Sequence, residues 1–144
     1  MRWPEALPFV QGAWNLLPKE KKFNFHARCY EYGAFVNYDC TSNGDFEGVR
    51  AQDILPLLID RFGFSKFVAF GNLPDIFVDR AYGKNFSPDD AADRRLIDYL
   101  EQLNAHLIDI GVIKPTMMLA CLRPEPVDCL YDRWSPEFSV RRPS

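Results

Sequence analysis

Apolar residues recur at helical spacing in two stretches of the first half of the chain. The first stretch spans residues 7–17, where Pro8 is tolerated in the first turn and Pro18 ends the element. The second spans residues 53–62, and Asp53 is expected to cap it because its carboxylate can accept from free backbone N–H groups. Apolar side chains occupy most sides of this second stretch, so we expect a helix buried around most of its circumference.

The clearest helical pattern in the chain begins at Ser87 and ends at Gly111. Ser87 is expected to cap this helix, with Pro88 at its first position and Asp89 and Asp90 near its positive end. Gly111 is suited to the left-handed conformation that often ends a helix. One apolar stripe is expected to face the core: Ala92, Leu96, Tyr99, Leu100, Leu103, Leu107 and Ile110.

Two short apolar runs are typical of buried strands. Residues 66–70 are bounded by turn formers, and residues 116–122 are apolar on both faces, which favours a central position in a sheet. We expect these two strands to pair with each other. Residues 19–48 are expected to be irregular apart from a short strand at 34–38, and residues 75–82 are expected to form a short helix.

Beyond Arg123, prolines alternate with charged residues, which predicts a flexible tail over residues 125–144 in which Trp134 and Phe138 are loosely ordered. Residues 1–124 are expected to form one α/β domain with three to four helices. Two strands are too few to cover the apolar faces of those helices. The sequence therefore predicts an incomplete sheet.

Four phrases of the chain resemble the closing third of a group of bacterial class I S-adenosylmethionine-dependent methyltransferases. They are FEGVRAQDILPLL at residues 46–58, FGNL at 70–73, FVDR at 77–80 and IKPTMMLA at 113–120. The resemblance extends over about residues 3–123. Met117 departs from it, because a polar residue, usually histidine, is expected at that position.

The resemblance implies a doubly wound sheet whose parallel strands bind the cofactor, followed by a substrate-side insertion, a last helix and an antiparallel closing pair of strands. Residues 1–50 would then be the substrate-side insertion, and residues 51–124 the last helix and closing strands. The implied cofactor is S-adenosylmethionine, and the implied substrate is a small molecule.

The glycines of this chain are nowhere spaced as Gly-x-Gly, the turn with which such folds hold a nucleotide. We therefore assign no cofactor-binding residue. Methyl transfer depends on close positioning of the cofactor and its acceptor, so the isolated chain is expected to be inactive. A separate cofactor-binding chain, or self-association, would complete the sheet.

Composition bears on partners and location. The formal net charge of −3 has the wrong sign for neutralising a phosphate backbone, so no nucleic-acid partner is expected, and the basic cluster at residues 19–22 is interpreted as a solvated helix exit. No apolar run reaches the roughly 18 residues needed to span a bilayer, so we expect a cytoplasmic protein without membrane contact. The four cysteines show no metal-ligand spacing and are expected to be free, buried thiols.

Five polar residues are candidates for substrate binding. Glu47 and Arg50 lie in the first of the four phrases, where a carboxylate could accept a proton from a substrate hydroxyl. His26 could act as a base, and Asp75 and Asp79 could line a pocket near the end of the first strand. The alternatives are a helix entry in which Arg50 pairs with Glu47, a surface or packing role for His26, and an ion pair on a helix face for the two aspartates.

Two functions follow from these observations. The first is that of the C-terminal, substrate-side portion of a small-molecule methyltransferase. The alternative is a non-catalytic protein-binding or self-associating module, because unpaired strand edges and apolar helix faces favour association.

Overall fold

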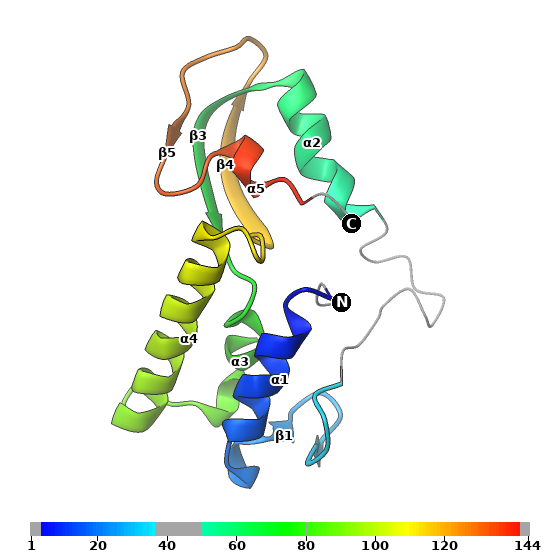
Figure 1. Cartoon of the computed structure of the whole chain (residues 1–144), viewed down its shortest axis with the longest axis vertical. Helices are drawn as coiled ribbons and strands as arrows, with labels where there is room; N and C mark the ends of the chain where they lie inside the picture. Colours follow the sequence, from blue (N-terminus) through cyan, green and yellow to red (C-terminus); the bar gives the residue numbers. More distant parts are fainter. Residues whose placement is uncertain (1–3, 37–49, 80, 142–144) are drawn as a thin grey trace. The chain divides into compact units, whose positions relative to one another are not determined.

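The structure is a computed structural model that describes residues 4–36, 50–79 and 81–141 (Figure 1). It divides into an N-terminal unit, formed by Met1–Tyr38 and Asn72–Ile113, and a C-terminal unit, formed by Asp39–Gly71 and Lys114–Ser144. Among the described residues, five α-helices accompany a two-stranded antiparallel sheet and a three-stranded mixed sheet. The α/β class is therefore confirmed, and the methyltransferase-type sheet stays a prediction.

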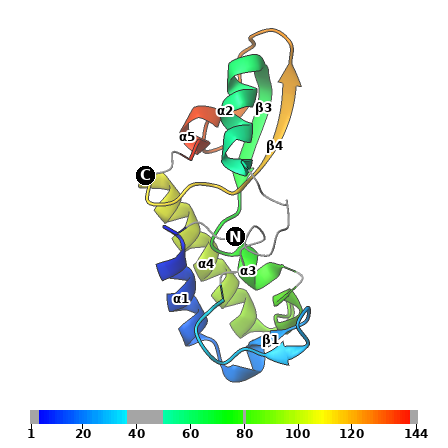
Figure 2. The same ribbon diagram turned by 90° about the vertical axis from the view of Figure 1, so that its right-hand side faces the viewer.

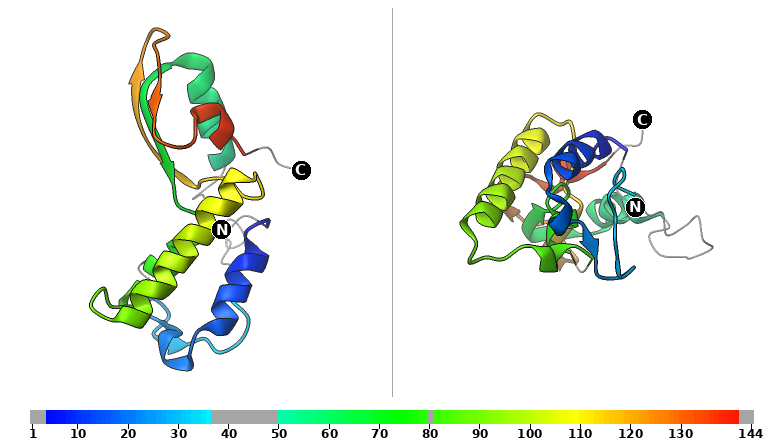
Figure 3. Two further views of the ribbon diagram at one scale, coloured as in Figure 1. Left: turned by 60° about the vertical axis from the view of Figure 1, so that its left-hand side comes forward. Right: turned by 90° about the horizontal axis from the view of Figure 1, so that it is seen from below.

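Helix α1, Leu7–Leu16, agrees with the first predicted helix. Its N-cap residue, Ala6, offers no side-chain cap, and a proline occupies the first turn, where a backbone N–H needs no partner. One face is buried, through Val10, Ala13 and Trp14. A short 3-10 helix, η1, Lys19–Lys21, follows. Together with α4, α1 is one of the two longest helices of the N-terminal unit (Figure 2 and Figure 3).

A small hairpin follows η1, where the sequence predicted irregular structure. Strand β1, Phe23–Asn24, pairs antiparallel with β2, Cys29–Tyr30. Of the strand expected at residues 34–38, the described part forms no strand, and the rest lies outside the described residues. Strands of two residues are too short to show an alternation of apolar and polar side chains, so the pattern could not reveal them.

Helix α4, Ala91–Asp109, is the long helix that the sequence predicted, but it begins at a different cap. The N-cap residue is Asp90, whose carboxylate accepts from the N–H groups of Ala92 and Asp93. The predicted cap, Ser87, accepts from the Asp89 N–H in the turn before the helix. Before α4 lie α3, Asp75–Val78, and the 3-10 helix η2, Gly83–Asn85, in place of one helix over 75–82.

The buried face of α4 also differs from the predicted stripe. Tyr99 and Ile110, both in that stripe, are 57% and 58% exposed. The buried residues of the helix are Asp93, Leu100, Asn104, Leu107 and Ile108. Two of them are polar and bind groups from elsewhere in the chain, as Asn104 does by accepting from the Leu73 N–H at 3.0 Å. Apolar positions alone therefore do not locate the buried face of α4.

The end of α4 agrees with the prediction at Gly111, which has a φ of 76°. The Gly111 N–H donates to Ile108 O at 2.9 Å, and the Val112 N–H donates to Leu107 O at 2.9 Å. This pair of bonds is the Schellman arrangement, which needs a left-handed residue after the helix.

Helix α2, Ala51–Arg61, belongs to the C-terminal unit. Its N-cap residue is Arg50 in the left-handed conformation, and Asp53 lies within the first turn. The prediction that Asp53 caps this helix is therefore wrong. None of the residues of α2, all of which are described, is buried, which corrects the expectation of a helix surrounded by other elements. One side packs against the sheet through Leu55, Leu58 and Ile59.

The sheet of the C-terminal unit contains β3, Gly63–Phe70, and β4, Met117–Arg123, paired antiparallel as predicted. A third strand, β5, Leu130–Tyr131, pairs parallel with β3, so the strand order is β4-β3-β5. Among the described strands, β4 therefore lies at an edge, and the predicted central position is wrong. Figure 2 shows α2 running beside β3 and β4.

The segment expected to be a flexible tail contains regular structure in its described part. It supplies β5 and a short helix, α5, Pro136–Ser139, whose cap Ser135 accepts from the Phe138 N–H at 3.2 Å. Lys114 Nζ donates to Phe138 O at 2.7 Å and lies 3.8 Å from the centroid of the Phe138 ring. The core of the unit consists of Phe64, Phe67 and Ala69, against which Met118, Cys129 and Trp134 pack.

Candidate functional site

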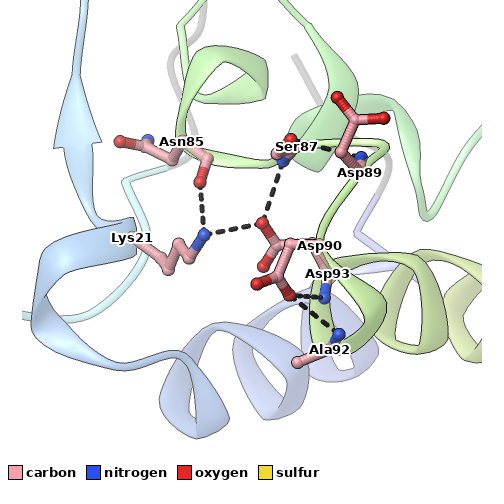
Figure 4. Close-up of polar contacts among 7 residues, drawn as sticks. All are labelled: Lys21, Asn85, Ser87, Asp89, Asp90, Ala92 and Asp93. Atoms are coloured by element: carbon pink, nitrogen blue, oxygen red, sulfur yellow. Dashed lines mark hydrogen bonds and ion pairs between the residues drawn. The ribbon is translucent and has the colours of Figure 1, made fainter.

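A carboxylate is buried in the N-terminal unit near the start of α4. Asp93 is 6% exposed, and its Oδ2 lies 2.7 Å from Lys21 Nζ (Figure 4). The same oxygen accepts from the Ser87 N–H at 2.9 Å, and the Lys21 ammonium also donates to Asn85 O at 2.7 Å. A buried charge needs such partners because removing it from water is costly. The ion pair therefore links η1, the turn before α4 and α4 itself.

The basic cluster at residues 19–22 is only in part the solvated helix exit that the sequence predicted, because Lys19 and Glu20 are exposed whereas Lys21 is half-buried and Lys22 is buried. Lys22 is 7% exposed, and its Nζ lies 5.3 Å from the centroid of the Trp14 ring. Lys21 Nζ lies 5.5 Å from the centroid of the Phe86 ring. Lysine stems pack against apolar groups while their ammonium groups meet rings or carboxylates. Lys22 therefore belongs to the interior of the unit, and Lys21 is half-buried.

Asp90 fixes the position at which α4 begins. Its carboxylate accepts from the Asp93 N–H at 2.9 Å and from the Ala92 N–H at 2.8 Å (Figure 4). These two backbone bonds hold the pKa of the Asp90 carboxyl below its usual value of 3.8. The free N–H groups of a helix start favour the charged form of a carboxylate. The charged form of Asp90 therefore strengthens the cap.

A pocket of about 270 Å³ lies among α3, η2 and the first turns of α4. The rings of Phe77 and Phe86, on its apolar side, meet edge to face with centroids 6.4 Å apart. The other lining residues are Val78, Gly83, Ser87, Pro88, Asp93, Arg94, Ile97 and Asp98. The pocket therefore combines aromatic and aliphatic walls with a few charged groups, as binding sites for small molecules do.

The charged groups of the pocket differ in how they are held. Asp93 already accepts from Lys21 and from the Ser87 N–H. Arg94 Nη1 donates to Pro88 O at 2.9 Å, which anchors the guanidinium beside the pocket. Asp98 is exposed to solvent and follows Arg94 by one helical turn. Of the two carboxylates, Asp98 is therefore the one placed to meet a ligand.

The predicted site residues His26 and Asp79 lie at two turns that contact each other. His26 is exposed between β1 and β2, and its N–H donates to Asn24 Oδ1 at 2.9 Å. The neighbouring Phe25 N–H donates to Ala81 O at 2.8 Å. Asp79 Oδ1 accepts from the N–H groups two and three residues further on, at 2.8 and 3.1 Å. Asp79 thus shapes its own turn, and neither residue lines the pocket.

Asp75 also has a local structural contact. Its Oδ2 accepts from the Asn72 N–H at 2.9 Å, which closes the turn that leads into α3. Asp75 is close enough to Glu101 on α4 to influence it: burial, and then the nearby Asp75 charge, raise the pKa of the Glu101 carboxyl. The sequence analysis did not single out Glu101. Neither of these two carboxylates is among the lining residues of the pocket.

The other two predicted residues belong to the C-terminal unit. Arg50 Nε lies 2.6 Å from Asp53 Oδ2, and the two side chains are 76% and 37% exposed. Glu47, proposed as the alternative partner of Arg50, lies outside the described residues. Arg50 is thus held at the start of α2, and the structure gives it a helix-entry contact.

The residues that form the pocket were missed because most of them are apolar side chains that look like ordinary core residues. One signal was available. Asp93 falls on the same helical line as Ile97, Leu100 and Leu107, at spacings of four, seven and fourteen residues. An acidic residue on the apolar side of a helix needs a buried cation. The lysines that precede Asp93, at positions 19, 21, 22, 66 and 84, were the candidates for that cation.

Other features of the described residues concern membrane spans, metal sites and cysteines. Of the described helices, none is both long and apolar enough to cross a bilayer. Among the described residues, no three or more His, Cys, Asp or Glu side chains are grouped as a metal site. Cys29 and Cys121 are exposed and Cys129 is half-buried, which corrects the expectation of buried thiols, and Cys40 lies outside the described residues. Comparison with protein-family models, curated proteins and solved structures gave no match.

Proposed function

We propose that the N-terminal unit binds a compact, hydroxyl-bearing organic molecule in the pocket beside α4, as the substrate-side part of an S-adenosylmethionine-dependent methyltransferase. The observation that carries this proposal is the pocket itself, in which Phe77, Phe86 and Ile97 form apolar walls next to Arg94 and Asp98. A buried ion pair between Lys21 and Asp93 supports the same wall.

The size of the pocket favours a small ligand. Its volume of about 270 Å³ lies just below the range of roughly 300–1,000 Å³ that is usual for ligand sites. A single ring with one or two substituents suits this volume, and the two phenylalanine rings offer edges and faces for it. A nucleoside joined to an amino acid is too large for the same space.

The polar groups favour a hydroxyl on that ligand. The Asp98 carboxylate accepts hydrogen bonds, and Arg94 is held beside it by its bond to Pro88 O. Together the two side chains are close to neutral, so they favour a polar, uncharged group over a strongly charged one. A hydroxyl that donates to Asp98 satisfies the carboxylate and leaves the ring in the apolar part of the pocket.

The methyltransferase assignment is supported by the sequence phrases and by the order of elements. Helix α2 leads directly into β3, and β3 pairs antiparallel with β4. The chain's own residues do not fit the cofactor: the glycines are nowhere spaced as Gly-x-Gly, and the pocket is too small. The cofactor would be held by a separate chain. We therefore assign binding of the substrate, and no chemical step, to this chain.

Calorimetry with p-cresol and toluene tests the proposal, because the two molecules differ chiefly by one hydroxyl. We expect p-cresol to bind about tenfold more tightly than toluene, the difference that a hydrogen bond to a charged group typically makes. Asp98→Asn should reduce this discrimination, and Ile97→Trp, which fills the pocket, should abolish binding of both. S-adenosylmethionine should give no heat of binding.

Three results would contradict the proposal. Equal affinity for p-cresol and toluene would show that Asp98 does not bind the hydroxyl. No binding of either molecule would show that the pocket is not a ligand site. Tight binding of S-adenosylmethionine by the isolated chain would show that the cofactor is not supplied elsewhere. Circular dichroism of each variant checks that the fold is retained.

A further inference from the structure

The hairpin of β1 and β2 has polar side chains on its inner face and aromatic side chains on its outer face. Side chains alternate between the two faces of a strand. On the inner face, the buried Asn24 donates through Nδ2 to Glu31 Oε1 at 2.8 Å and to Tyr82 OH at 3.3 Å. On the outer face, Phe23 lies directly opposite Tyr30. A hairpin that only covers a core turns its apolar face inwards, so the reversed arrangement indicates a binding surface.

The outer face presents a continuous series of four rings, the aromatic row, formed by Phe25, Phe23, Tyr30 and Tyr32. Neighbouring ring centroids are 5.0, 5.1 and 5.5 Å apart in that order. Tyr30 and Tyr32 are 49% and 58% exposed, and the two phenylalanines are half-buried. The Phe25 N–H donates to Ala81 O at 2.8 Å, which anchors the hairpin to the turn before η2. Flat groups can therefore pack on rings that are already held in place.

Cations lie at both ends of the aromatic row. Lys19 Nζ lies 5.8 Å from the centroid of the Tyr32 ring, and Lys84 Nζ lies 5.5 Å from the centroid of the Phe25 ring. Both lysines are exposed. The hairpin, all of whose residues are described, has one acidic residue, Glu31, whose carboxylate belongs to the inner face. The outer face is therefore complementary to a ligand that carries both flat rings and negative charge.

We propose that the aromatic row binds single-stranded nucleic acid. A single strand exposes bases that stack on protein rings and phosphates that meet lysines, and proteins that bind it without sequence preference combine these two contacts. A duplex keeps its bases stacked inside and an acidic peptide has no regular series of flat rings, so each would use only the charge of the row. This inference goes beyond the proposed function, because none of the four rings lines the pocket beside α4.

The charge that matters for this binding is local. The formal net charge of −3 predicted no nucleic-acid partner, but it is a sum over the whole chain. Charges more than about 10 Å away are largely screened at 0.1 M salt, so a bound strand responds mainly to the groups that it touches. The cations against the rings of the row are Lys19 and Lys84. Two phosphate contacts predict a shallow salt dependence, with a slope of log K against log salt of about −1.4.

Fluorescence anisotropy of labelled oligonucleotides with the full chain tests the proposal. The probes are oligothymidylate and oligouridylate of about ten nucleotides, and an abasic DNA of the same length. We expect at least one base-carrying strand to bind at low salt with a Kd below about 100 μM, and the tighter one identifies the sugar that the row prefers. The abasic strand should bind at least about fivefold more weakly than oligothymidylate, the loss expected from one unstacked base.

Three results of this experiment would overturn the proposal. Equal binding of oligothymidylate and the abasic strand would show that the row responds to charge alone. Absence of binding of both base-carrying strands at about 200 μM protein would show that it is not a nucleic-acid site. Displacement of the bound strand by polyglutamate of equal charge would assign the row to acidic peptides.

Tyr30 offers a matched pair of variants at an exposed position. Tyr30→Ala removes one ring and should weaken the binding of oligothymidylate by at least about fivefold, whereas Tyr30→Phe keeps the ring and should change it by less than about twofold. Lys19→Gln should reduce the salt slope by about 0.7. Circular dichroism checks the fold, and Tyr32→Ala, at the most exposed ring of the row, repeats the test if Tyr30→Ala unfolds. Full affinity in folded alanine variants would refute the role of the row.

Discussion

Lys21 and Asp93 form an ion pair with an N–O distance of 2.7 Å although they are 72 residues apart in the sequence. The pair joins the 3-10 helix after α1 to the first turn of α4. Lys21 comes from a stretch whose charge pattern alone indicates solvated surface. The pair also stands behind one wall of the pocket, so the stability of the N-terminal unit and the shape of the candidate site depend on the same contact.

Loss of one member of this pair should destabilise the protein strongly. Asp93→Ala leaves Lys21, whose side chain is 28% exposed, without its carboxylate. Breaking a buried pair usually costs about 3–5 kcal/mol, and the partial exposure of Lys21 places the expected loss at about 2–3 kcal/mol. Urea unfolding followed by circular dichroism measures it. Asp89→Ala, at an exposed position in the same turn, is the control and should change the free energy of unfolding by less than about 0.5 kcal/mol.

Two glycines of the N-terminal unit should respond to alanine in opposite directions. Gly111 has a φ of 76°, and a side chain there is strained, so Gly111→Ala should cost about 1–2 kcal/mol. Gly12 lies inside α1, and a Cβ added there meets no atom within 4 Å. Gly12→Ala should therefore stabilise the protein by about 0.5–1 kcal/mol. Urea midpoints of the two variants that move in the same direction would contradict the described conformations.

The Asp90 cap of α4 should make the stability of the protein fall at low pH. The pKa of Asp90 is lower in the folded chain than its ordinary value of 3.8, so its charged form contributes stability that is present above pH 3.8. That contribution is lost as the pH falls through the lower pKa of the folded state. Asp90→Asn keeps a capping oxygen and has no charge to lose. Melting temperatures measured between pH 7 and pH 2.5 should therefore converge for the two proteins at the acid end.

The raised pKa of Glu101 should act in the opposite sense. Burial and the Asp75 charge raise the pKa of Glu101 above its ordinary value of 4.5, so its ionisation is disfavoured in the folded chain. The resulting stability is present below pH 4.5 and is lost as the pH rises through the higher pKa. Glu101→Gln should therefore stabilise the protein slightly at pH 7, by no more than about 0.5 kcal/mol because Glu101 is only partly withdrawn from solvent. Destabilisation at pH 7 would show that Glu101 makes a favourable contact.

Local patterns were enough to find the long elements of the fold. The spacing of apolar residues located α1, α2 and α4, and short apolar runs located β3 and β4 and their pairing. The cap at Asp90 was missed because Ser87 and Pro88 form a turn that resembles a helix start. Strand β5 was missed because two residues among prolines and charges carry no periodic signal.

The candidate site could not be predicted in the same way, because it depends on contacts between distant segments. Four of the five predicted residues lie in the described part of the chain, and none of these lines the pocket. Asp75 and Asp79 accept hydrogen bonds from nearby backbone N–H groups, a role that aspartate takes at many turns. Sequence spacing shows that a carboxylate is present, but the use of that carboxylate depends on the groups that the fold brings to it.

The most direct measurement is a titration of the ¹⁵N-labelled chain with p-cresol, followed by the amide shifts in two-dimensional NMR spectra. We expect that the amides of Phe77, Phe86, Ser87 and Ile97 shift in a saturable manner and that those of β3 and β4 do not. The same titration of Ile97→Trp should leave all of these amides unchanged. Shifts confined to the C-terminal unit, or no saturable shift at the pocket, would contradict the assignment of the N-terminal unit as a small-molecule binding site.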